Sequence, residues 1–144
     1  MKLQTLCDNI GKYGCLAICY CYIAGRELGI DNNDLLNALA FQTIYECVGT
    51  EALHDDMFVE DPVSIIRKAA QIAGNKELYP NIEKKTITSF KDLMGDSYAA
   101  VELLSNTTTH FVVAEYGLKV YDPLEYSYVS KYGNPISARI VSFK

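Results

Sequence analysis

Hydrophobic positions follow a helical period in the first part of the chain and a strand pattern in the last part. Residues 15–24 contain no charged or helix-breaking residue. A helix that is apolar on every side must be buried. This stretch therefore predicts a central buried helix that begins at Cys15 and frays between Gly25 and Gly29.

Two further helices are predicted from start signals and from apolar residues at helical spacing. The first follows capping residues at 31–33 and ends at Gly49. The residues that recur at helical spacing are Leu35, Leu36, Leu39, Ala40, Thr43, Ile44 and Cys47. The second begins at Asp61 and Pro62, because a capping carboxylate followed by proline favours a helix start, and Gly74 ends it.

The last third of the chain is rich in β-branched and aromatic residues, which favour strands. The predicted strands are 98–104, 110–115, 118–122 and 138–143. Residues 1–14 predict an extended arm and turn, 75–87 a short strand or extended connection, and Thr88 or Ser89 caps a brief helix that Gly95 closes. Helices followed by an antiparallel sheet indicate an α+β domain.

Composition and charge narrow the class of protein. A chain of 144 residues predicts one domain, residues 1–144, with 49% hydrophobic and 22% charged residues as in ordinary soluble proteins. The net charge is −5 and no basic run occurs, which argues against nucleic acid or an anionic membrane as a partner.

Cysteine usage indicates a cytoplasmic protein. The five cysteines are Cys7, Cys15, Cys19, Cys21 and Cys47. An odd number crowded toward one end is not typical of a secreted disulfide scaffold. Lys2 and Lys12 precede the apolar run, but Asp8 lies in what would be the basic part of a signal peptide, and the run is too short to span a bilayer.

Cys15 is the strongest candidate for chemistry. The N–H groups and dipole at a helix start favour the thiolate, which is a nucleophile, and a neighbouring N–H can stabilise an oxyanion. The alternative is a plain core residue, since cysteine is among the most buried residue types.

The chain has two histidines, and only one lies in a promising place. His54 lies in an acidic loop and is predicted to be solvated. His110 opens a strand that returns to Asp122. A three-residue loop at 115–117 would place these two residues directly opposite each other, on one face. A two-residue loop at 116–117 would shift the pairing by one residue.

A histidine oriented by a carboxylate, facing a cysteine at a helix start, is the arrangement of a Cys–His–acid triad. In this interpretation His110 takes the thiol proton and Asp122 orients the ring. Cys19 and Cys21 have no second cysteine pair to complete a zinc site. No glycine-rich phosphate loop occurs either, so we expect neither a metal nor an organic cofactor.

Three segments together resemble papain-like cysteine peptidases. They are Tyr13–Ala17, Thr109–Val113 and Val120–Pro123. The match is nearest to the bacteriocin-leader (double-glycine) peptidase branch and its small bacterial and phage relatives, and it runs in order from about Asn9 to Asp122. The resemblance implies a papain-like fold, in which the nucleophile helix and further helices pack on a C-terminal antiparallel sheet.

By this resemblance Cys15 is the nucleophile, His110 the base and Asp122 the orienting acid. The family usually has a glutamine shortly before the nucleophile, whose amide donates to the oxyanion. Asn9 stands at that position here, and Gln4 lies further back. An asparagine amide is an adequate donor of shorter reach, so either residue, or neither, would serve.

The sequence therefore predicts a thiol hydrolase that cleaves a peptide or other amide bond in a peptide or protein substrate. The alternative is a papain-like binding or host-interaction module without turnover, which the altered oxyanion position favours. A third interpretation, a redox pair of Cys15 and Cys19, would have to meet the narrow geometry of a disulfide.

Overall fold

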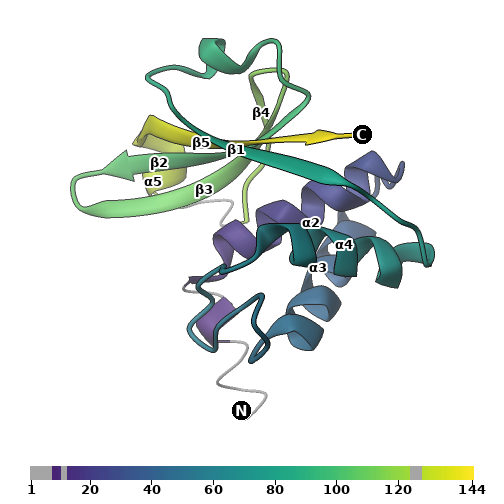
Figure 1. The fold of residues 1–144 in the computed structure, drawn as a ribbon. Helices are drawn as coiled ribbons and strands as arrows, with labels where there is room; N and C mark the ends of the chain where they lie inside the picture. The colour runs from purple at the N-terminus through teal and green to yellow at the C-terminus, as the bar shows by residue number, and fades with distance from the viewer. Residues whose placement is uncertain (1–7, 11–12, 124–127) are drawn as a thin grey trace. The chain divides into compact units, whose positions relative to one another are not determined.

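A computed structural model describes residues 8–10, 13–123 and 128–144. The chain divides into two compact units, Met1–Pro80 and Asn81–Lys144. The described helices of the first unit and the strands of the second are labelled in Figure 1. Helices followed by a sheet make the protein an α+β structure, as the hydrophobic pattern predicts.

Three helices form the body of the first unit: α2 (Cys15–Glu27), α3 (Asn33–Cys47) and α4 (Pro62–Gly74). The α2 helix packs against both α3 and α4, which also pack against each other. Its interior from Ala17 to Gly25 is almost entirely buried, as expected for a helix without a polar face. No helix within the described residues is long and apolar enough to cross a membrane.

Local capping explains where α3 and α4 begin. The Asn32 side chain accepts a hydrogen bond from the Leu35 N–H at 3.1 Å, and Asp61 accepts one from the Ser64 N–H at 3.1 Å. These bonds satisfy N–H groups that have no partner within the helix. The α4 helix includes the glycine expected to end it and is closed by Asn75 in the left-handed conformation, with φ of 55°.

A sheet with strand order β1-β5-β2-β3-β4 forms the second unit. The strands are β1 (Pro80–Thr86), β2 (Tyr98–Ser105), β3 (Thr108–Glu115), β4 (Leu118–Tyr121) and β5 (Asn134–Phe143). Antiparallel pairing joins β2 to β3 and to β5, and β3 to β4. The brief predicted helix is a 3-10 helix, η1 (Phe90–Leu93), capped by Ser89.

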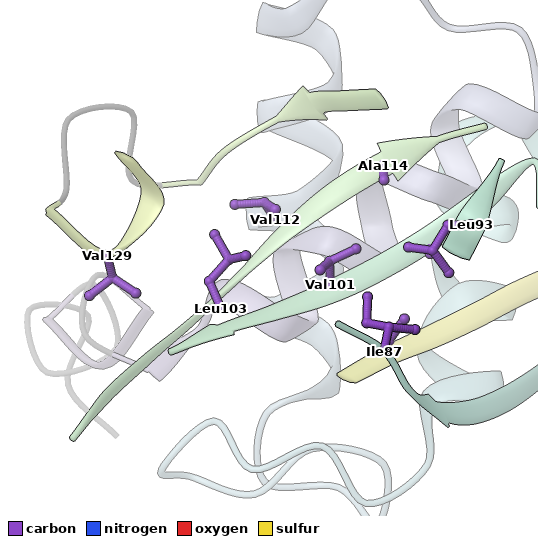
Figure 2. Close-up of a cluster of buried hydrophobic side chains, with 9 residues drawn as sticks. Ile87, Leu93, Val101, Leu103, Val112, Ala114 and Val129 are labelled. Carbon is purple, nitrogen blue, oxygen red and sulfur yellow. The ribbon is translucent and has the colours of Figure 1, made fainter. Parts of the chain in front are cut away.

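One face of this sheet carries a buried apolar cluster, shown in Figure 2. The sheet contributes Ala99, Val101, Leu103, Val112, Ala114 and Ala138. Ile87, Leu93 and Val129 complete the cluster. Val129 belongs to α5 (Tyr128–Tyr132), a short helix that the hydrophobic pattern did not predict and that packs against β2 and β3.

Candidate active site

The turn between β3 and β4 differs from the three-residue loop that we predicted. Glu115 pairs with Leu118, so the loop consists of Tyr116 and Gly117 alone. Both loop residues have positive φ, 52° and 78°, as a type I′ hairpin turn requires. Such a turn matches the twist of the flanking strands, which explains why the shorter alternative forms.

A β-bulge in β4 compensates for the register shift that the shorter loop causes. Ala114 pairs with Lys119 but Val113 pairs with Tyr121, so Val120 is the extra residue. Without the bulge, the two-residue loop would set Asp122 opposite a residue of the other sheet face. With it, continuing the register by one residue sets Asp122 opposite Val112, whose side chain shares a face with that of His110. No hydrophobic period marks a single inserted residue, which is why the sequence did not reveal it.

His110 and Asp122 are in contact at the base of this hairpin. His110 Nε2 lies 2.7 Å from Asp122 Oδ1, and the side chains are only 3% and 12% exposed. His110 pairs across the strands with Leu103, so it lies on the same face as the apolar cluster of Figure 2. A carboxylate accepts from an Nε2–H, and the neutral ring then offers Nδ1 as the proton acceptor.

Cys15 is the first residue of α2 and is half-buried. Gly14 precedes it as the N-cap and has no side chain to bond the first N–H groups of the helix. A Cβ atom on Gly14 would lie 2.7 Å from the Ile10 carbonyl oxygen, which accepts the Gly14 N–H at 3.0 Å. Residues 8–10 are helical, so the extended arm predicted there is wrong.

The other described cysteines are buried in the helical unit. Cys19 and Cys21 have no exposed surface, and Cys47 has almost none. Burial raises the pKa of the Cys21 thiol to about 12 and also raises the pKa of Cys47. A thiol held protonated in this way is a poor nucleophile. Cys7 lies outside the described residues.

The two candidates for the oxyanion donor differ in what the structure shows. The Asn9 amide donates to the Asp55 carbonyl at 3.1 Å, so one of its two N–H groups is committed to the loop before α4. The same loop carries His54, which is 51% exposed and lies 3.7 Å from Glu60, as expected for a solvated residue. Gln4 lies outside the described residues.

Of the predicted triad, the structure establishes one contact, between His110 and Asp122. Cys15 belongs to the first unit and the His–Asp pair to the second. Among the described residues, no group of three or more His, Cys, Asp or Glu side chains is arranged to hold a metal ion. Comparison with protein-family models, curated proteins and solved structures found no match for this chain.

Proposed function

We propose that this protein is a papain-like thiol hydrolase of the cytoplasm, built as a single papain-like domain that includes both units. Its substrate would be a peptide or other amide bond in a peptide or protein. The contact between His110 and Asp122 carries the proposal, because it orients a buried imidazole for proton transfer. The position of Cys15 at a helix start supports it.

In the proposed reaction, His110 Nδ1 accepts the proton of the Cys15 thiol and the thiolate attacks the amide carbonyl carbon. N–H groups at the start of α2 hold the resulting oxyanion. Collapse breaks the C–N bond, and the leaving amine takes the proton from His110. Water then hydrolyses the thioester with His110 as base, which releases the acid and restores the thiol. Asp122 holds the ring and stabilises the imidazolium throughout.

The second candidate is a papain-like binding module without turnover. The Asn9 amide favours it, because the hydrogen bond to Asp55 occupies one of the donors that an oxyanion would need. This candidate retains the His110–Asp122 pair as a structural contact.

A peptide-library screen of the parent protein and three variants distinguishes the two candidates. We expect Cys15→Ser to keep the fold, because the change is nearly isosteric, and to lose most turnover. His110→Ala should match it closely, since members of a triad act as a unit. Asp122→Asn should retain more activity, because the surroundings still partly orient the ring.

Two outcomes of this screen would contradict the hydrolase. Turnover that survives in Cys15→Ser but vanishes in Cys7→Ser would identify a different nucleophile. A partner captured equally well by the parent and Cys15→Ser, with no turnover on any peptide, would establish the binding module.

A further inference from the structure

An open groove of about 450 Å³ lies in the first unit, along one face of α4 and the segment that follows it. Its lining residues are Ser64, Arg67, Lys68, Gln71, Asn75, Lys76, Glu77 and Leu78. The volume is within the range of natural ligand sites, about 300–1,000 Å³. The proposed hydrolysis uses none of these residues.

The groove concentrates positive charge in a protein whose net charge is −5. Lys68 is paired with Glu46 at 3.5 Å, so its charge is partly compensated. Arg67 and Lys76 line the groove and form no ion pair with a carboxylate of the described residues. The guanidinium of Arg67 lies 5.7 Å from the centre of the Tyr79 ring, a contact that holds the cation in place.

Two acidic side chains near the groove accept hydrogen bonds from neighbouring hydroxyl groups. Glu77 accepts a hydrogen bond from the Tyr79 hydroxyl at 2.8 Å. At the other end of the groove, the Ser64 hydroxyl donates to Asp61 at 2.6 Å. The Asp61 carboxylate would repel an anion there. The favourable region for an anion therefore runs from Arg67 toward Lys76.

The two cations are separated by groups that suit a peptide. Gln71 and Asn75 line the groove between them, and a side-chain amide both donates to a carbonyl and accepts from an N–H. From Arg67 to the C-cap residue Asn75, α4 rises about 12 Å, the length of roughly four extended residues. The segment that follows α4 forms the second wall of the groove. Backbone hydrogen bonds hold it in place: the Asn75 N–H donates to the Gln71 carbonyl at 2.7 Å, and the Lys76 N–H donates to the Ala70 carbonyl at 3.1 Å.

We infer that this groove binds an extended acidic peptide segment, with carboxylates about four residues apart at Arg67 and Lys76. The amides of Gln71 and Asn75 hydrogen-bond the peptide backbone between them. The spacing of the cations distinguishes such a segment from a compact phosphate, which one cation cluster would bind. This inference goes beyond the proposed hydrolysis and holds whether or not the protein is an enzyme.

Fluorescence anisotropy tests the inference on full-length Cys15→Ser protein, which prevents cleavage of the probe. The probe is a labelled peptide with glutamates at its first and fifth positions, and the comparison peptide carries glutamine at both. We expect binding of the glutamate peptide that weakens with salt. Arg67→Gln/Lys76→Gln should weaken it about tenfold, since the variant removes two exposed ion pairs that solvent partly screens.

The matched control is Lys84→Gln/Lys85→Gln, which removes the same charge from exposed positions on β1. It should change the affinity by less than about twofold, because these positions lie outside the groove. Equal losses in the two double variants would overturn the inference, and so would equal binding of the glutamine peptide. Pyrophosphate that displaces the peptide and binds more tightly would assign the groove to a compact phosphate ligand instead.

Discussion

The start of α2 and the base of the β3–β4 hairpin each hold one part of the proposed active site, and they are built in different ways. Cys15 takes its place from neighbours in sequence, a glycine N-cap and an uninterrupted apolar run. The His110–Asp122 contact depends on a two-residue turn and a bulge that together set which face Asp122 occupies. A nucleophile can thus be placed by local signals, whereas its proposed partner depends on pairing between strands.

We expect the largest effect on turnover from the substitution of one histidine, His110, and almost none from the other, His54. His110 is buried against a carboxylate at 2.7 Å, whereas His54 is half-exposed and lies 3.7 Å from Glu60. We expect His110→Ala to lower turnover by about 10³-fold or more, since it removes the base of a triad. His54→Ala should leave turnover near the parent value. Turnover would be measured on a substrate found by the peptide library. Equal losses of turnover in the two variants would contradict the role of His110 as the base.

Insertion of one alanine between Tyr121 and Asp122 tests whether the register places Asp122. The insertion would set Asp122 opposite a residue of the sheet face that His110 does not occupy. We expect turnover to fall about 10²-fold, the usual contribution of a well-oriented proton-transfer group. Deletion of Val120 is the control, because it removes the bulge but leaves Asp122 opposite Val112, and it should keep the activity. An insertion variant that is folded by circular dichroism and fully active would show that the register does not matter.

The turn itself should be sensitive to a single methyl group. Gly117 has φ of 78°, and a Cβ atom there would lie 2.7 Å from the Phe90 carbonyl oxygen. We expect Gly117→Ala to lower the free energy of unfolding by about 2 kcal/mol in urea denaturation. Gly95→Ala is the control, because a Cβ atom at Gly95 would meet nothing within 4 Å. Two equally stable variants would mean that the turn contributes no strain.

Thiol labelling compares the start of α2 with the buried thiols of its unit. Cys15 is half-buried at a helix start, whereas burial raises the pKa of Cys21 to about 12. Iodoacetamide near neutral pH, read by mass spectrometry, should label Cys15 at least about tenfold faster than Cys19, Cys21 or Cys47. Full denaturation should equalise the rates. Faster native labelling of Cys47 than of Cys15 would contradict the proposed nucleophile.

We expect the smallest effect on stability from the N-cap residues of the helical unit. Hydrogen bonds from the Ser64 hydroxyl and then its N–H lower the pKa of Asp61. Asp61→Ala should cost about 1 kcal/mol at neutral pH. A lowered folded-state pKa stabilises the protein above a pH of about 4, and this part is lost as the pH falls through that pKa.

The pH-dependent part is small because Asp61 is exposed and solvent screens its charge. Asn32→Ala removes an uncharged cap and serves as the control. Its cost, followed by thermal melts, should not change over the same acid range. A cost of Asp61→Ala that is equally independent of pH would show that the cap acts through geometry alone.

The sequence by itself determined most of the helical unit. Asp61 followed by a proline, and Asn32 before an apolar period, act on N–H groups three residues away, so their effect is decided within one helical turn. The α+β class followed from the change in hydrophobic period. Residues 8–10 were predicted incorrectly, because Gly11 and Gly14 favour a turn and no long hydrophobic period marks their short helical segment.

Only the tertiary structure decided how the hairpin presents its residues. The sequence-based prediction placed His110 opposite Asp122 through a three-residue loop. The protein instead has a two-residue loop and an extra residue, Val120, in β4. Each change shifts the register by one residue, and two shifts return Asp122 to the same face. Side-chain periodicity repeats every two residues, so it could predict the shared face, but it could not detect that the two shifts add and set Asp122 opposite Val112 and not opposite His110.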